Sequence, residues 1–99
     1  MEADWTQDPV VRELREQISA TDLALLEAVN RRLELVRRLH DYKRERGYPL
    51  VDRSREHALL AELERVNAGP LSAGGLRELY AALLDLGKRE AANPGARTL

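Results

Sequence analysis

Charged residues stand in the first half of the sequence at positions where a helix would bury apolar side chains. Arg32 falls in a series of apolar residues spaced three and four apart, where Leu or Ile is expected. Burying an uncompensated guanidinium is costly, so Arg32 needs a partner of opposite charge. That partner is either an acidic residue of a neighbouring chain, such as Glu27 or Glu34, or an anionic ligand held inside a helical bundle.

Lys43 and Arg15 extend this pattern. Lys43 follows Arg32 by eleven residues, so on a helix the two cations share a face about 16 Å apart. Two long side chains that lean toward each other can grip a small dianion. Arg15 precedes Arg32 by seventeen residues, roughly 25 Å along a helix axis. It can reach an equivalent pocket only in a second, antiparallel protomer.

A second place for an anion lies where a later helix is expected to begin. Asp52 is a good N-cap, and Arg55 and Glu56 follow in the first turn. Backbone N–H groups at a helix N-terminus favour negative charge, and the planar guanidinium of Arg55 can bind a carboxylate through two hydrogen bonds. An ion pair of Arg55 with Asp52 or Glu56 explains the same residues without a ligand.

The composition excludes several kinds of chemistry. The 99 residues contain no cysteine, which excludes a disulfide scaffold, a thiolate metal site and a thiol nucleophile. A net charge of −1 argues against a general nucleic-acid binder. No uncharged run is long enough to span a membrane, and the acidic N-terminus lacks the apolar region of a signal peptide. We therefore expect a soluble, cytoplasmic protein.

The elements expected to position these residues are all helices. The first begins near Pro9, with Asp8 as its N-cap, and meets no breaker before Gly47. Roughly 37 residues would form a rod about 55 Å long, whereas a globule of this mass has a radius of gyration of about 13 Å. The rest of the chain cannot cover such a rod, so it must be buried against another chain.

The apolar pattern on this segment also indicates association. One series has heptad spacing: Val11, Leu14, Ile18, Thr21, Leu25, Ala28, Arg32, Leu35, Leu39 and Tyr42. A second stripe lies beside it: Leu26, Val29, Leu33 and Val36. A face this wide suits a helix with more than one neighbour. An ordinary two-stranded coiled coil explains the segment equally well when it is taken alone.

Two shorter helices follow the first. The second begins after Asp52 and ends before the Gly69–Pro70 break, and Ser72 can cap the third. We therefore predict an all-α chain of one long and two short helices, divided into a tail over residues 1–8, one domain over residues 9–91, and a flexible tail over residues 92–99.

These residues resemble the all-helical chorismate mutases over about residues 11–90. The resemblance is carried by LREQI at 14–18, Asp22, Asn30-Arg31-Arg32, Lys43, Gly47-Tyr48-Pro49, Val51-Asp52 and Arg55-Glu56. It implies an intertwined homodimer of three-helix chains that rearranges chorismate to prephenate, a step toward phenylalanine and tyrosine. The reaction is unimolecular, so the resemblance implies no cofactor and no metal.

The resemblance also implies catalytic roles. Arg15 would reach from the second protomer to one carboxylate of chorismate, and Arg32 would bind the other, so that each site is composite. Lys43 would donate to the ether oxygen, where negative charge grows as the C–O bond breaks. Glu56 would lie near the enolpyruvyl side chain or orient its neighbours.

Further residues are implied for binding. Asp52 would accept a hydrogen bond from the ring hydroxyl, and Arg55 would hold a carboxylate or order the pocket. Family members place a Gln or a Glu on the third helix as a second donor to the ether oxygen, and this helix has no Gln. Counting without gaps puts Ala91 there, with Glu90 beside it and Gly87 where a small polar residue is usual.

The missing donor suggests a slow enzyme. The stretch 83–88 resembles that of the short actinobacterial-type mutases, which are activated by a partner DAHP synthase. One lost transition-state hydrogen bond costs about 10²–10³ in rate. We therefore predict low activity for the isolated dimer, and a DAHP synthase as an activating partner.

Three alternatives stay open. An isochorismate pyruvate lyase shares the fold and the loop lysine, although Asp52 favours the mutase. A mutase for the 4-amino analogue of chorismate differs only in the group that faces the ring hydroxyl. The chain can also be a non-catalytic helical dimer subunit, but a scaffold gains nothing from charges in its apolar seam.

Overall fold

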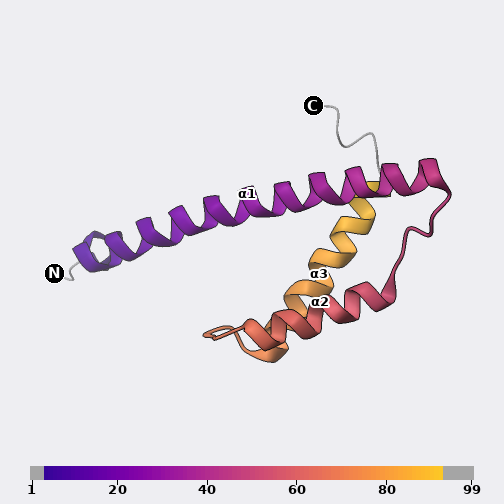
Figure 1. Ribbon diagram of the computed structural model, residues 1–99. Coiled ribbons are helices and arrows are strands. Elements are labelled where there is room, and N and C mark those ends of the chain that lie inside the picture. The colour runs from indigo at the N-terminus through magenta and orange to yellow at the C-terminus, as the bar shows by residue number, and fades with distance from the viewer. Residues whose placement is uncertain (1–3, 93–99) are drawn as a thin grey trace. The chain divides into compact units, whose positions relative to one another are not determined.

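The computed structural model describes residues 4–92 of the chain. These residues form a short 3₁₀ helix and three α-helices: η1 (Trp5–Gln7), α1 (Pro9–Arg46), α2 (Arg53–Val66) and α3 (Ala73–Ala92). Figure 1 follows this order along the chain. Residues 4–92 contain no strand, so the prediction of an all-α chain with one long and two shorter helices is confirmed.

The helices begin where the sequence places capping residues. Asp8, Asp52 and Ser72 each accept a hydrogen bond through a side-chain oxygen from a backbone N–H two or three residues later, at 2.9–3.0 Å. Such oxygens satisfy N–H groups that have no partner within the helix. The three predicted caps are therefore confirmed.

Gly47 ends α1 and sets the direction in which the chain leaves it. It has a φ of +71°, in the left-handed region that favours glycine. Its N–H donates to the Arg44 carbonyl at 3.3 Å, and the Tyr48 N–H donates to the Lys43 carbonyl at 2.8 Å. These two bonds form a Schellman motif, which attaches the loop over residues 47–52 to the last turn of α1.

The structure adds detail at both predicted tails. The predicted tail over residues 1–8 contains η1, because the Asp4 carboxylate accepts the Thr6 N–H at 3.0 Å and caps a 3₁₀ turn. At the other end, α3 includes Ala92. The rest of the predicted flexible tail, residues 93–99, lies outside the described residues, as do residues 1–3 of the predicted N-terminal tail.

The chain divides into two compact units, Met1–Arg32 and Leu33–Leu99. In the first unit, the described residues include none that is buried. Six large apolar side chains on the α1 part of this unit are between 53% and 64% exposed: Val10, Leu14, Ile18, Leu23, Leu25 and Leu26. The first part of the heptad series is therefore open to solvent in the single chain.

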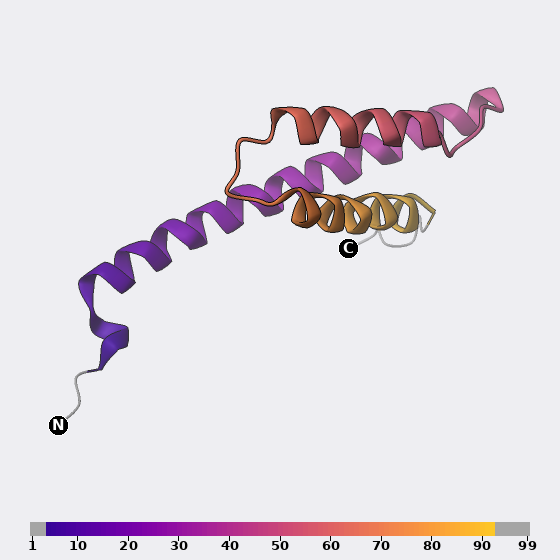
Figure 2. The same cartoon turned by 90° about the horizontal axis from the view of Figure 1, so that it is seen from below.

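In the second unit, α2 and α3 form a helical hairpin. Figure 2 shows them antiparallel, joined at one end by the 67–72 connection. The buried residues of α3 are Leu76, Gly87 and Ala91. Burying a leucine contributes about 1.5–3 kcal/mol, whereas ordering one backbone residue costs about 1–2 kcal/mol. The described part of the single chain therefore lacks a core large enough to offset the entropy of folding.

None of the helices in residues 4–92 has the length and apolar character that a bilayer-spanning segment requires.

Candidate active site

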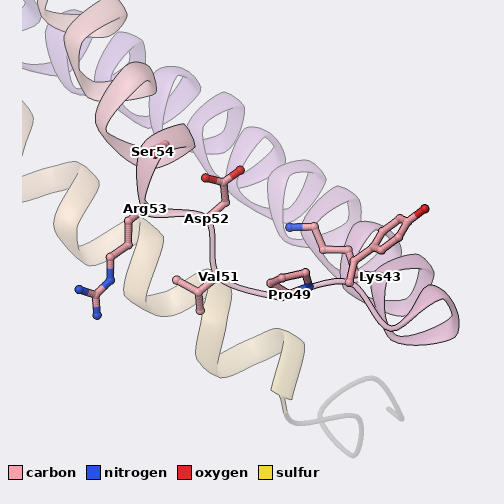
Figure 3. Close-up of a pocket in the computed structure, with 7 residues that line it drawn as sticks. Lys43, Pro49, Val51, Asp52, Arg53 and Ser54 are labelled. Carbon is pink, nitrogen blue, oxygen red and sulfur yellow. The ribbon is translucent and has the colours of Figure 1, made fainter.

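A pocket of about 460 Å³ lies in the second unit, where the end of α1, the loop over residues 47–52 and the start of α2 meet. Its lining residues are Lys43, Tyr48, Pro49, Val51, Asp52, Arg53 and Ser54. Figure 3 shows these side chains around the loop. The volume falls within the range of sites for small molecules, about 300–1,000 Å³.

Lys43 supplies a half-buried ammonium to this pocket. Its Nζ donates to the Leu50 carbonyl at 3.4 Å, so the loop directs the side chain. Figure 3 shows the Lys43 side chain extending from α1 toward the start of α2, where Asp52 stands. Among residues 4–92, Lys43 and Asp52 do not form an ion pair. The pocket thus holds a cation and an anion that are both available to a ligand.

Asp52 caps α2 and also presents a carboxylate oxygen to the pocket. Its Oδ1 accepts the backbone N–H of Arg55 at 3.0 Å and caps α2. Within the described chain, Oδ2 accepts no hydrogen bond. The cap therefore fixes the carboxylate while one oxygen stays open, and that oxygen can accept a hydrogen bond from a ligand hydroxyl.

The sequence left open an ion pair between the Arg55 guanidinium and Asp52 or Glu56. Within residues 4–92, neither of these ion pairs forms. Glu56 pairs instead with Lys88 of α3, at 2.9 Å between Oε1 and Nζ. The Glu56 side chain is 22% exposed, so this pair is partly shielded from water. It links the first turn of α2 to α3.

The three candidates on α3 do not line the pocket, whose described lining comes from α1, the loop and α2. Gly87 and Ala91 are buried and Glu90 is half-buried. The Ala91 carbonyl accepts a hydrogen bond from the Arg44 guanidinium at 3.5 Å. Ala91 thereby joins the end of α3 to the end of α1.

Arg15 and Arg32 belong to the first unit, whereas the pocket belongs to the second. Arg32 is half-buried and is the last residue of its unit. Arg15 is exposed, and its guanidinium carbon lies 5.0 Å from the centroid of the Trp5 ring. The contact with Trp5 was not expected from the sequence.

The last turn of α1 is strongly cationic. It carries Lys43, Arg44 and Arg46, at the end of the helix where cations complement the dipole. The pKa of His40 lies below its ordinary value, because the imidazole is partly buried and because the Arg44 and Lys43 cations disfavour its charged form; Asp41 opposes this shift. This concentration of positive charge favours an anionic ligand beside the pocket.

The loop residues contribute more of the pocket than the sequence suggested. Tyr48, Pro49 and Val51 form an apolar part of the lining, and the sequence had identified them only as part of a turn and a motif. Arg53 also lines the pocket, and Figure 3 shows its guanidinium pointing away from Asp52. The signal that could have identified Tyr48, Pro49 and Val51 is their position between Lys43 and Asp52, the cap of α2.

Comparison with known proteins gives one family match. A family model described as chorismate mutase type II matches residues 14–91. Neither a curated protein nor a solved structure matches the chain. The matched range contains the whole pocket and the two candidate arginines of the first unit, Arg15 and Arg32, but it begins after η1.

Proposed function

Since the chain belongs to the chorismate mutase type II family, we propose that it catalyses the rearrangement of chorismate to prephenate in aromatic amino acid biosynthesis. The match over residues 14–91 carries this proposal. The pocket supports it, because an ammonium and an open carboxylate oxygen suit a substrate with two carboxylates, an ether oxygen and a hydroxyl.

Lys43 and Asp52 have the central roles in this proposal. The reaction breaks a C–O bond and forms a C–C bond within one molecule, so negative charge develops on the ether oxygen while no group is transferred to the protein. Lys43 donates a hydrogen bond to that oxygen and stabilises the charge in the transition state. Asp52 accepts the ring hydroxyl through Oδ2, which holds the substrate in the reactive conformation.

We propose that the active form is a homodimer with composite sites. The support is the exposed apolar face of α1, where Leu14, Ile18 and Leu25 are each more than half exposed. A second copy can cover this face and supply the core that the single chain lacks. In such a dimer, Arg15 of one protomer serves the pocket of the other, and Arg32 binds the second carboxylate.

The remaining candidates act around this centre. Arg55 holds a carboxylate or orders the pocket, and Glu56, paired with Lys88, orients its neighbours. On α3, the half-buried Glu90 can donate to the ether oxygen only when protonated. We therefore propose low activity for the isolated dimer. A DAHP synthase as an activating partner stays a prediction from the resemblance.

The test is a direct assay on the purified chain. Loss of chorismate absorbance is followed, and the product is identified by chromatography; prephenate is the expected product. Pyruvate with salicylate from isochorismate would assign the chain to the lyases, and preferential turnover of 4-amino-4-deoxychorismate would assign it to the amino analogue. No turnover of any of the three substrates would contradict an enzymatic role.

The dimer is tested separately, by sedimentation equilibrium of the same sample. A molecular mass of twice 11.2 kDa is expected. A monomer that keeps full activity at all concentrations would contradict the composite site.

A further inference from the structure

An aromatic residue outside the family match lies against a residue of the proposed site. The Arg15 guanidinium carbon is 5.0 Å from the centroid of the Trp5 ring, within the roughly 6 Å over which a cation is attracted to an aromatic face. Both residues belong to the unit Met1–Arg32. The family match begins at residue 14, so Trp5 belongs to a segment that the family does not account for.

The backbone of η1 connects Trp5 firmly to α1. The Trp5 carbonyl accepts the Asp8 N–H at 3.1 Å, and the Asp4 carbonyl accepts the Gln7 N–H at 3.0 Å. The Asp8 carboxylate in turn caps α1 through the Val10 N–H. The same residue thus ends η1 and begins α1, so the indole has a defined place beside the first turns of the helix.

Burial of the Trp5 indole does not account for its contact with the Arg15 guanidinium. Trp5 is 63% exposed, so the contact buries little apolar surface. Its effect falls on Arg15, an exposed side chain with many rotamers of its own. Contact with the ring restricts those rotamers.

The contact with the ring leaves the N–H donors of the guanidinium available to a ligand. The N–H donors of arginine lie in the plane of the group, while an aromatic ring contacts its face. Among residues 4–92, no hydrogen bond or ion pair occupies the Arg15 donors. They can therefore bind a carboxylate through two parallel hydrogen bonds while the guanidinium stays beside the indole.

We propose that Trp5 is a positioning residue for Arg15, which holds the guanidinium so that its in-plane donors meet a substrate carboxylate. The inference rests on the proposed function, in which Arg15 serves the pocket of the second protomer. A cation–π contact at an exposed site corresponds to about a two- to fivefold effect on binding. The effect should fall on KM rather than on kcat, because the carboxylate keeps its charge throughout the reaction.

The first test measures the contact without any enzyme activity. Trp5 is the only tryptophan in the chain, so the tryptophan emission reports on its surroundings alone. Removing the cation beside the ring in Arg15→Gln should shift the emission maximum or change its intensity. Arg12→Gln is the matched control, since it removes an exposed arginine one turn away that makes no cation–π contact with Trp5. Equal spectra for wild type and Arg15→Gln would overturn the proposal.

The second test measures the role of the contact. Trp5→Ala should raise KM for chorismate about two- to fivefold with kcat nearly unchanged, and Trp5→Phe, which keeps an aromatic face, should restore most of the loss. Circular dichroism should show equal helix content in all variants, because the Trp5 side chain is largely exposed. An unchanged KM in Trp5→Ala, or a Trp5→Phe variant as impaired as Trp5→Ala, would overturn the inference.

The two proposals fail in different ways. A wild-type chain that does not turn over chorismate contradicts the proposed function, whatever the fluorescence shows. An active wild type whose KM does not depend on Trp5 contradicts this inference alone.

Discussion

Asp52 allows the structural and chemical roles of one carboxylate to be separated. Oδ1 caps α2, and Oδ2 is the proposed acceptor for the ring hydroxyl. Asp52→Ala removes both oxygens. Asp52→Asn keeps the cap, since Asn caps helices as well as Asp does, and because its oxygen must face the Arg55 N–H, its NH₂ replaces Oδ2. The Asn variant therefore loses the acceptor alone.

The magnitudes follow from these two roles. Loss of an N-cap costs about 0.5–2 kcal/mol, so Asp52→Ala should lower the free energy of unfolding by about 1 kcal/mol, while Asp52→Asn should change it by a few tenths. A hydrogen bond to a charged group contributes about 1.5–3 kcal/mol, so both variants should lower kcat/KM at least about tenfold. Ser72→Ala is the control, because it removes the cap of α3 outside the pocket lining.

The measurements are urea unfolding at one fixed protein concentration, since association contributes to stability, and steady-state kinetics with chorismate. We expect Ser72→Ala to lose stability and to keep a normal kcat/KM. Asp52→Asn should keep its stability and lose kcat/KM. An Asp52→Asn variant with wild-type kcat/KM would show that the residue serves only as a cap, and would refute the assignment of Oδ2 to the substrate.

Three further predictions use other parts of the chain. Lys43→Gln should lower kcat/KM about 10²–10³-fold by removing the donor to the ether oxygen. Its control is Arg38→Gln, which removes an exposed α1 cation outside the pocket lining and should leave kcat/KM near normal. Equal losses of kcat/KM in the two variants would contradict a specific role for Lys43. The folded-state pKa of His40 lies below its ordinary value of 6.5, so the unfolded chain takes up the proton first as pH falls. The free energy of unfolding should therefore decline as pH drops through 6.5. His40→Gln should flatten this pH dependence in unfolding curves measured across pH. A His40→Gln variant with the same slope of unfolding free energy against pH as the wild type would contradict the role of His40. Gly47→Ala should destabilise the protein by about 1–2 kcal/mol, because residue 47 has a φ of +71°. Gly74 has no positive φ and open space where a Cβ would lie, so Gly74→Ala should be neutral or stabilising by up to about 1 kcal/mol. Thermal unfolding of both variants tests the difference.

The helix boundaries were predictable because local chemistry determines them. Asp8, Asp52 and Ser72 bond to N–H groups two or three residues away, and Gly47 has the backbone conformation that closes a helix. Such signals require no knowledge of tertiary contacts. The placement of Lys43 beside Asp52 was predictable for the same reason, since a short loop joins them.

The contacts that were missed join residues without a shared local pattern. Glu56 meets Lys88 only because α2 and α3 pack in one register, and neither periodicity nor spacing specifies that register. Trp5 contacts Arg15 because a 3₁₀ turn precedes α1. The hydrophobic pattern predicts only a tail for that segment. Each contact depends on how two elements meet, which a one-dimensional pattern does not encode.

The loop that closes α1 has a kinetic consequence. Every residue that lines the pocket lies within residues 43–54, and Lys43 is bonded to the loop twice, through its carbonyl to Tyr48 and through its ammonium to Leu50. Segments of about ten residues close in roughly 10–100 ns, and contacts of short sequence separation form early in folding. This half of the site can therefore assemble on the nascent chain, ahead of any encounter with another molecule.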